Sequence, residues 1–355
     1  MPIITGPHQY VEDDLFIDLG ATFHRGLYLK CEGFNFGGSV KLKVAAEMVD
    51  RAERSGALTP GSILVESSSG NLGVALSTVA ANRGLGFVCV TDSRCNPTTV
   101  ALMRALGATV HVVTTPHPTG GLVGARVALI RELLAADDRY VWTNQYANPA
   151  NWTAHYRRTA PAILRRFPDL DLLFVGAGTT GTLMGCARHL RDTGSGATVV
   201  AVDTRGSVSF GGPPGRRLIP GLGMGFRPPL LDKSYVDDVV LVDEAETVRT
   251  CRALAGHGFL LGGSTGTVLA GALSWLAAHP DRRGTAVAIA PDLGERYLRS
   301  VYDDEWLLAS YGPDVLGVGL PDVPGFPAAG FDGAALDGAA FDGAAPEDLP
   351  MTAAS

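Results

Sequence analysis

Four loops of this sequence combine glycines with side chains that could hold an organic phosphate, a carboxylate and an aldehyde. The first loop, residues 35–41, ends in Lys41, and the others span residues 66–73, 175–182 and 262–267. A lysine amine can form a Schiff base with pyridoxal phosphate, whose phosphate, ring nitrogen and substrate carboxylate each need partners of their own. The four loops together predict an enzyme that uses pyridoxal phosphate.

Lys41 stands where a helix is predicted to begin, over residues 40–54. The positive end of the helix dipole would lower the pKa of its amine and so favour the neutral, nucleophilic form. We therefore predict that Lys41 is the catalytic residue and the covalent anchor of the cofactor. Without the other loops, a solvated lysine in the first turn of a helix would be the better interpretation.

The loop at 175–182 suits the phosphate group of the cofactor. It follows a predicted strand and opens a helix, where free backbone N–H groups and the helix dipole bind anions. The predicted phosphate ligands are Gly178, Thr179, Thr180, Gly181 and Thr182.

The same loop also matches the dinucleotide-binding fingerprint, with Asp203 at the end of the following strand as the acid for a ribose hydroxyl. An NAD-dependent dehydrogenase is therefore an alternative. That alternative leaves the other three loops without a role.

The two remaining loops supply polar groups for the ring and the substrate. Ser264 is predicted to contact the ring nitrogen, and a hydroxyl there leaves this nitrogen largely unprotonated. Such a ring favours the departure of a group from Cβ over transamination, which indicates β-elimination and β-replacement. The serine-rich loop is predicted to hold the substrate carboxylate through Ser67, Ser68, Ser69, Gly70 and Asn71, with Asn71 also reaching the ring oxygen. A plain helix-capping loop is the simpler alternative.

Predicted strands and helices alternate along most of the chain, which is typical of an α/β fold with parallel sheets. The strands are expected at 62–66, 86–91, 108–113, 172–175, 198–203 and 286–290. Residues 203–229 are rich in glycine and proline and predict a long loop of the active-site type. A repeated Asp-Gly-Ala-Ala motif near the C-terminus predicts a disordered acidic tail over residues 312–355.

The composition argues against several other functions. A net charge of −7 without a dense basic stripe argues against a nucleic-acid partner. No apolar run is long enough to span a membrane and the first residues do not resemble a signal peptide, so a cytoplasmic location is expected. The 5 cysteines and 8 histidines show no metal-binding spacing. We therefore predict no metal site and reduced, structural thiols.

The motifs resemble, over residues 26–311, the cysteine synthase and cystathionine β-synthase group of fold-type II pyridoxal phosphate enzymes. The shared pattern is Ser-Val-Lys at 39–41, Ser-Gly-Asn at 69–71, the glycine- and threonine-rich loop, and Gly-x-Ser at 262–264. Within this group, the stretches 206–211 and 292–297 look most like the 2,3-diaminopropionate pathway synthases.

The resemblance implies a two-domain, tryptophan synthase β-like fold with open, twisted, mostly parallel sheets flanked by helices. Residues 1–38 and 147–311 would form a large cofactor domain, and residues 39–146 a small, mobile substrate domain. The resemblance also implies a homodimer that joins O-phospho-L-serine to an amine, L-glutamate, to make a 2,3-diaminopropionate precursor of a siderophore or peptide antibiotic. A cysteine synthase and a catalytically silent relative are alternatives.

Further residues could complete the substrate site. The resemblance assigns Gln145 to the substrate carboxylate. Arg126 follows a glycine-rich turn and could bind a substrate carboxylate or phosphate with its planar guanidinium, although a surface arginine explains it equally well. Arg216 and Arg217, in the long loop, could face a leaving phosphate, with a solvated pair as the simpler alternative.

Overall fold

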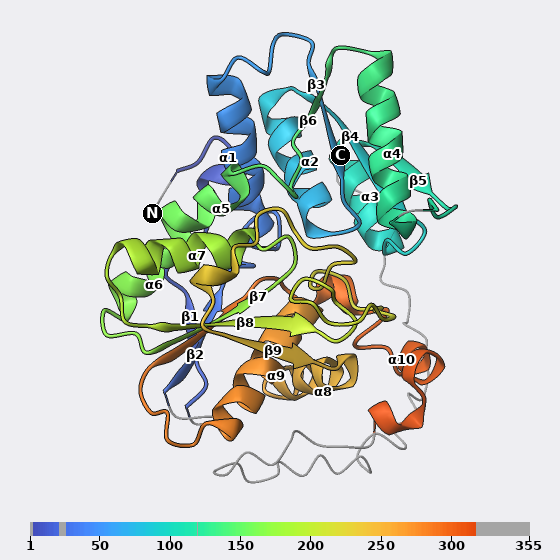
Figure 1. Cartoon of the computed structure of the whole chain (residues 1–355). Helices are drawn as coiled ribbons and strands as arrows, with labels where there is room; N and C mark the ends of the chain where they lie inside the picture. Colours follow the sequence, from blue (N-terminus) through green and yellow to red (C-terminus); the bar gives the residue numbers. More distant parts are fainter. Residues whose placement is uncertain (1–2, 21–25, 119, 317–355) are drawn as a thin grey trace, which may run out of the picture.

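Two open sheets of mostly parallel strands form the framework of the protein (Figure 1). The computed structural model describes residues 3–20, 26–118 and 120–316. The larger sheet has the strand order β1-β2-β10-β7-β8-β9, and its pairs are parallel except for β1 with β2. Its strands are β1 (Phe16–Asp18), β2 (Leu27–Cys31), β7 (Leu172–Gly176), β8 (Thr198–Thr204), β9 (Asp238–Val242) and β10 (Ala286–Ala290).

The smaller sheet is parallel throughout and has the order β5-β4-β3-β6. Its strands are β3 (Ile63–Ser67), β4 (Gly86–Asp92), β5 (Thr109–Val113) and β6 (Tyr140–Trp142). All of them come from the middle of the sequence, whereas the larger sheet is built from both flanking parts. The order of strands therefore agrees with a small unit inserted into a large one.

Helices cover both sheets and connect their strands. They are α1 (Lys41–Arg54), α2 (Asn71–Arg83), α3 (Pro97–Ala105), α4 (Gly121–Ala136), α5 (Ala150–Ala154), α6 (Ala160–Arg166), α7 (Gly181–Asp192), α8 (Glu244–Gly256), α9 (Gly263–Ala278) and α10 (Asp304–Tyr311). A π-helical turn, His155–Thr159, joins α5 to α6, and short 3₁₀ turns lie at Pro7–Gln9, Lys233–Tyr235, Glu295–Tyr297 and Pro313–Val315. Over these described ranges, no helix is both long enough and apolar enough to cross a membrane.

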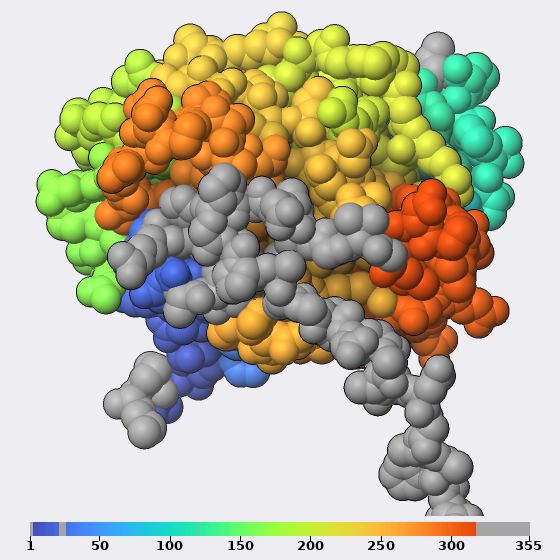
Figure 2. All heavy atoms as spheres, turned by 90° about the horizontal axis from the view of Figure 1, so that it is seen from below, coloured from blue at the N-terminus to red at the C-terminus, as the bar shows by residue number. Residues whose placement is uncertain are grey.

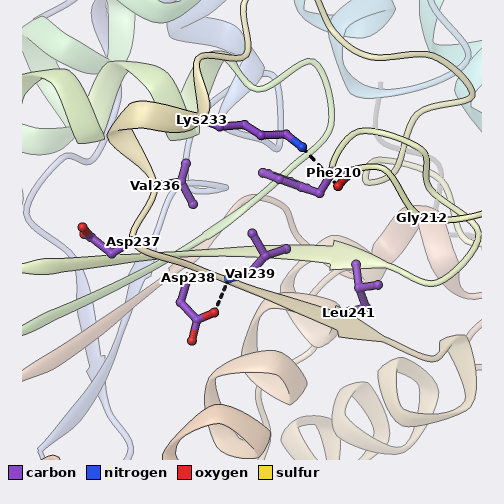
Figure 3. Close-up of a pocket in the computed structure, with 8 residues that line it drawn as sticks. All are labelled: Phe210, Gly212, Lys233, Val236, Asp237, Asp238, Val239 and Leu241. Atoms are coloured by element: carbon purple, nitrogen blue, oxygen red, sulfur yellow. Dashed lines mark hydrogen bonds between the residues drawn. The ribbon is translucent and has the colours of Figure 1, made fainter.

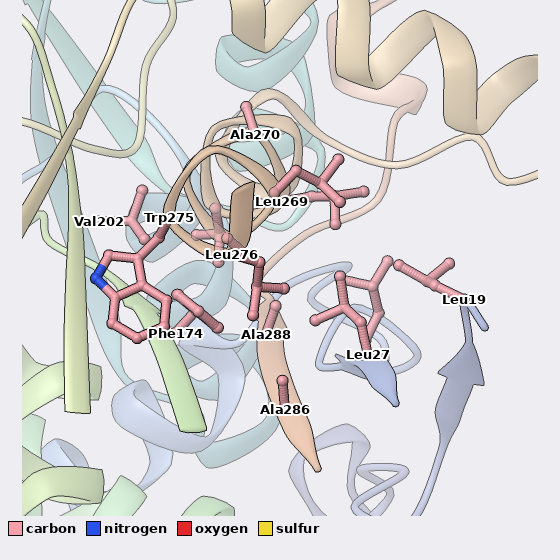
Figure 4. Close-up of a cluster of buried hydrophobic side chains, with 14 of the residues drawn as sticks. Leu19, Leu27, Phe174, Val202, Leu269, Ala270, Trp275, Leu276, Ala286 and Ala288 are labelled. Carbon is pink, nitrogen blue, oxygen red and sulfur yellow. The ribbon is translucent and has the colours of Figure 1, made fainter. Parts of the chain in front are cut away.

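The core of the larger unit lies between its sheet and α9 (Figure 4). Strand β10 is buried along its whole length, as expected of a parallel strand covered on both faces. Trp275 of α9 packs edge-on against Phe174 of β7, with 5.6 Å between the ring centroids. A Cβ at Gly271 would lie 2.5 Å from Cγ1 of Val202, so glycine allows α9 to approach β8 closely.

The six predicted strands are all present, each within one residue of the expected bounds. The predicted helix at 40–54 and the loop at 203–229 are confirmed as well, because residues 205–232 contain no helix or strand. The α/β fold class is therefore confirmed. Four strands were not predicted: the short strands β1 and β6, the edge strand β9, and β2 in the larger sheet.

The ordered part of the chain extends beyond the predicted end at Tyr311. Val315 is only 3% exposed and packs with Val248 and Leu307 in a small apolar cluster. Figure 2 shows this C-terminal segment, in red, on one flank of the molecule. The predicted tail therefore begins too early at residue 312, and residues 317–355 lie outside the described part of the chain. The proposed domain boundaries themselves remain a prediction.

Candidate active site

Lys41 and Asn71, two of the predicted site residues, lie where the first turns of α1 and α2 approach the loop after β10. The side-chain amide of Asn71 donates a hydrogen bond of 2.9 Å to Oδ2 of Asp292. The backbone N–H of Val40 donates a bond of 2.7 Å to the carbonyl of Pro291. Because the carboxyl ends of parallel strands are the usual binding edge of such sheets, this meeting point is the expected place for a site.

Lys41 is the first residue of α1, as predicted. Burial lowers the pKa of its amine to about 8, while the Asp292 carboxylate acts in the opposite direction. Removal from water disfavours the charged ammonium. The helix dipole was the expected cause, whereas burial is the largest cause in the structure. A neutral amine near physiological pH suits attack on an aldehyde.

Asp292 is a central site residue that the sequence analysis did not single out. Its carboxylate is 1% exposed and accepts a hydrogen bond of 2.5 Å from the Tyr297 hydroxyl, besides the bond from Asn71. Burial raises the pKa of Asp292, and these hydrogen bonds oppose the rise. Arg296 donates to Oδ1 of Asn71, so both ends of the Asn71 amide are fixed. The available signal was the stretch 292–297, which had served only to support the family resemblance.

The loop before α7 has the features of a phosphate cradle. Thr180, at the N-cap of α7, has a left-handed backbone with a φ of 67°, which is uncommon for a residue with a side chain. Its Oγ1 is buried and has no hydrogen-bond partner among the described residues. Asn151, which the sequence analysis also missed as a site residue, donates a bond of 2.9 Å to the Thr179 hydroxyl. An unpartnered buried hydroxyl beside a helix N-terminus fits an incoming phosphate.

Two glycines let this cradle pack closely against its neighbours. A Cβ at Gly181 would lie 2.0 Å from Oδ1 of Asn151, and a Cβ at Gly178 would lie 2.6 Å from the Gly221 carbonyl. Any side chain at either position would displace the loop. The residues present therefore fit the phosphate of pyridoxal phosphate.

The serine-rich loop turns tightly before α2. The Ser68 hydroxyl accepts hydrogen bonds from the backbone N–H groups of Gly70, at 3.3 Å, and Gly73, at 3.0 Å. Ser69, Gly70 and Asn71 are partly exposed at the tip of the turn. Ser68 thus holds the turn together, while its neighbours are accessible to a carboxylate.

A buried glutamate joins this loop to the segment that carries Gln145. Glu66 accepts hydrogen bonds from the backbone N–H groups of Ser67 (2.7 Å) and Gln145 (3.0 Å), from the Thr143 hydroxyl (2.5 Å) and from the Trp142 indole (3.2 Å). Gln145 in turn donates a bond of 2.6 Å to the Ser67 carbonyl. Burial raises the pKa of Glu66, and the four donors oppose that rise. Glu66 is thus a positioning residue, not recognised from the sequence.

Ser264 lies in the first turn of α9 and is 3% exposed. A Cβ at Gly221, whose φ is +110°, would lie 2.1 Å from the Ser264 hydroxyl oxygen. Burial and the Asp292 charge raise the pKa of Tyr297, whereas the Ser264 hydroxyl acts in the opposite direction. Ser264 is therefore next to the Asp292 and Tyr297 pair, which also contacts Asn71. Its contact with a ring nitrogen stays a prediction.

Arg126 belongs to α4, in the smaller unit. Its guanidinium is buried and forms an ion pair of 3.3 Å with Asp92, at the end of β4. It is therefore not the surface arginine of the simpler interpretation. Its predicted contact with substrate would require the pair with Asp92 to open, and this role stays a prediction.

The environment of Asp203 does not favour a dinucleotide site. Asp203 is fully buried, and its Oδ1 accepts a hydrogen bond of 2.9 Å from the backbone N–H of Thr204. Burial raises its pKa to about 6. An acid that binds a ribose hydroxyl would have to face an open cleft as a carboxylate.

A surface cavity of about 430 Å³ lies away from this site, along β9 (Figure 3). It is lined by Phe210, Gly212, Lys233, Val236, Asp237, Asp238, Val239 and Leu241. It contains none of the predicted site residues. Among the residues that the structure describes, no cluster of three or more His, Cys, Asp or Glu could hold a metal ion. The five cysteines are free and buried.

Comparison with known proteins identifies the family. The model of the pyridoxal-phosphate dependent enzymes matches residues 17–292. N-(2-amino-2-carboxyethyl)-L-glutamate synthase of Ralstonia nicotianae is 41% identical over 283 residues, which are 79% of this chain and 83% of that protein.

Two crystal structures show the same fold. O-ureido-L-serine synthase superimposes with a TM-score of 0.77 at 33% identity, covering 86% of this chain and 99% of that one. The O-acetylserine dependent cystathionine β-synthase from Helicobacter pylori superimposes with a TM-score of 0.74 at 27% identity, covering 84% and 99%. The match to the family model spans the strands from β2 to β10 and the four glycine-rich loops. The chain therefore belongs to the fold-type II pyridoxal-phosphate dependent enzymes and is a β-replacement synthase that depends on this cofactor.

Proposed function

We propose that the enzyme joins L-glutamate to Cβ of O-phospho-L-serine and releases inorganic phosphate. The product would be N-(2-amino-2-carboxyethyl)-L-glutamate, a precursor of 2,3-diaminopropionate for a siderophore or peptide antibiotic. The observation that carries the proposal is the 41% identity to a synthase of that name across 79% of this chain. The site supports it with a partly buried lysine of lowered pKa, a loop suited to a phosphate and a hydroxyl-rich loop for a carboxylate.

The serine-rich loop would bind the α-carboxylate of phosphoserine. Backbone N–H groups and hydroxyls from Ser67 to Asn71 lie at the start of α2, where the helix dipole favours an anion. The side chain of Gln145 is tied to the Ser67 carbonyl and would complete this clamp. Glu66 would hold the serine-rich loop and the segment with Gln145 in place relative to each other through its four hydrogen bonds.

Lys41 would anchor the cofactor and then move the proton at Cα. When bound, pyridoxal phosphate supplies the electron withdrawal that acidifies this proton. The lysine amine takes the proton from Cα as the Cβ–O bond breaks and phosphate leaves with the bonding electrons. The glutamate amine then forms a bond to Cβ and loses a proton, and Lys41 returns a proton to Cα. Phosphoserine and glutamate thus give the product and phosphate with all atoms accounted for.

Arginines would stabilise the leaving phosphate. Arg217 is partly buried in the long loop and donates a hydrogen bond to the Gly206 carbonyl. Arg126 would contribute if its pair with Asp92 opens when substrate binds. Each charge-assisted hydrogen bond to the phosphate would be worth ~1.5–3 kcal/mol.

We also propose that residues 39–146 move as a small domain that closes over bound substrate, and that the enzyme is a homodimer. The two units touch through Asn96, whose amide donates a bond of 2.7 Å to the Arg296 carbonyl, and through the rings of Tyr146 and Phe226, 5.4 Å apart. Closure would exclude water from the reacting atoms. Sedimentation measurements with and without phosphoserine test the dimer and a more compact closed form.

The experiment that tests the reaction is direct product analysis. Purified enzyme is supplied with phosphoserine and isotopically labelled glutamate, and in parallel with O-acetylserine and sulfide. Mass spectrometry should detect the labelled adduct with the first pair and no cysteine with the second, and Lys41→Ala should form no adduct. Turnover of acetylserine and sulfide without adduct formation would instead establish a cysteine synthase.

A further inference from the structure

A buried chain of hydrogen bonds connects the phosphate cradle to a lysine behind it. The Thr182 hydroxyl is 3.1 Å from Nε2 of His155, and Nδ1 of His155 is 3.0 Å from the Thr159 hydroxyl. The Lys43 ammonium donates a bond of 3.1 Å to the same Thr159 oxygen. All four side chains are buried, and His155 and Thr159 have no exposed surface.

The chemistry of the four groups fixes the direction of these bonds. An ammonium can only donate, so the Thr159 oxygen accepts from Lys43. The Thr159 hydroxyl then donates its hydrogen to Nδ1 of His155, which is the acceptor that the contacts of the described residues offer. A neutral imidazole with an accepting Nδ1 carries its proton on Nε2, which donates to Thr182. The Thr182 hydroxyl is left to donate onward, into the cradle.

The imidazole is held in this neutral state by its surroundings. Burial lowers the pKa of His155 well below its usual range, and the nearby charges of Lys43, Lys41 and Lys30 lower it further. A single proton shared between two fixed partners gives the ring one tautomer. The neutral His155 imidazole therefore accepts a hydrogen bond at Nδ1 and donates one at Nε2, without carrying a charge.

Positive charge accumulates at the far end of the chain. The Lys43 ammonium forms ion pairs with Glu32 at 2.7 Å and Asp13 at 2.8 Å. Glu32 is shared with the fully buried Lys30 at 3.1 Å, and Asp13 is shared with Arg158 at 2.6 Å. Three cations thus face two carboxylates. This leaves a net positive charge at the end of the chain that is farther from the phosphate cradle.

The backbone is adapted to this arrangement. His155 and Thr159 are the first and last residues of the π-helical turn between α5 and α6. A Cβ at Gly185 would lie 2.6 Å from Cβ of His155 and 2.3 Å from the Trp152 carbonyl, so glycine lets α7 approach this turn. Single π turns inside helices often mark functional positions.

We propose that Lys43, Thr159 and His155 form a relay of donors that turns the Thr182 hydroxyl toward the cofactor phosphate and strengthens its hydrogen bond. Chains of aligned hydrogen bonds polarise one another, and a bond to an anion gains most from this. The three residues are positioning residues, because only Thr182 would touch the phosphate. The inference concerns the cofactor and is independent of which substrates the enzyme joins.

The test compares two cofactor forms that differ only in the phosphate. Full-length apoenzyme is titrated with pyridoxal phosphate and with pyridoxal, and binding is followed by absorbance. Thr159→Val removes the central hydroxyl at nearly constant shape, and Thr159→Ser keeps it. The matched control is Thr153→Val in the neighbouring α5, whose hydroxyl bonds only to the Pro149 carbonyl of its own turn at 2.9 Å in the structure.

Thr159→Val should weaken the binding of pyridoxal phosphate about tenfold while changing that of pyridoxal less than about twofold, because the Thr182 bond to the phosphate would be weakened by about 1.4 kcal/mol. The phosphorus NMR signal of the bound cofactor should shift in the same variant. Thr159→Ser and Thr153→Val should match the wild type. Equal weakening of both cofactor forms, or no weakening of either, would overturn the relay. If Thr159→Val does not fold, His155→Gln is judged by the same ratio.

Discussion

Lys41 should capture pyridoxal phosphate with a pH dependence centred near 8. Its pKa is lowered from 10.5 to about 8 by burial, and only the neutral amine attacks the aldehyde. At pH 7.5, about one quarter of such amines are neutral, against about one in a thousand for a lysine of ordinary pKa. The capture rate of the apoenzyme should therefore rise steeply between pH 7 and 8.5 and level off above pH 9.

Replacing the neighbouring carboxylate tests the electrostatic part of this reasoning. The Asp292 carboxylate stabilises the Lys41 ammonium, so Asp292→Asn should lower the pKa of Lys41 further. The midpoint of the pH profile should move toward 7. Asp138→Asn, an exposed carboxylate of the small unit, provides the matched control and should leave the midpoint unchanged.

The assay mixes stripped apoenzyme with pyridoxal phosphate in a stopped-flow instrument across pH 6 to 10 and follows the cofactor absorbance band. Two results would refute the reasoning. The first is a wild-type midpoint above about pH 9.5, which would mean that burial does not control the lysine. The second is a rise in the midpoint for Asp292→Asn, which would mean that the carboxylate does not act on Lys41 as described.

Three further predictions concern the surrounding residues. Glu66→Gln should reduce the free energy of unfolding by ~1–3 kcal/mol in urea titrations, because an NH2 group replaces one carboxylate oxygen and leaves the donors of that oxygen without an acceptor; an unchanged free energy would contradict the positioning role of Glu66. Ser264→Asp should slow elimination from phosphoserine about tenfold or more, since a carboxylate would hold a proton on the ring nitrogen, and equal rates would mean that Ser264 does not contact that nitrogen. Gly181→Ala should weaken cofactor binding in equilibrium dialysis, because its Cβ would overlap Asn151, and retention of wild-type affinity would show that the cradle tolerates displacement.

The loops were predictable because their chemistry is local. A glycine-rich turn before a helix can be recognised within a few residues, and each of the four loops does open a helix in the structure. The same holds for the buried parallel strands, whose apolar runs need no knowledge of their neighbours. The four missed strands lack this signal. β1 and β6 have three residues each, β9 is a half-exposed edge strand, and the five residues of β2 include the charged Lys30.

The groups that hold the loops were not predictable, because they act across long separations in sequence. Asp292 is 221 residues from Asn71, yet their side chains share a hydrogen bond. Glu66 reaches Gln145 across 79 residues. Nothing near either carboxylate in the sequence indicates its partner. The lowered pKa of Lys41 has the same origin, since its first cause is burial by distant segments and not the helix that it begins.

The alternatives for the glycine loop at 175–182 show where sequence reasoning reaches its limit. A dinucleotide and a phosphate monoester both need free N–H groups at a helix start, so the local pattern cannot separate them. The separation comes from what lies behind the loop. Asn151 fills the space that a side chain at Gly181 would need, and His155 reaches Thr182 from the π-helical turn. Meanwhile the acid expected to bind a ribose, Asp203, is buried against its own backbone. A compact phosphate would fit against such a wall, whereas a dinucleotide would need an open surface beyond the loop.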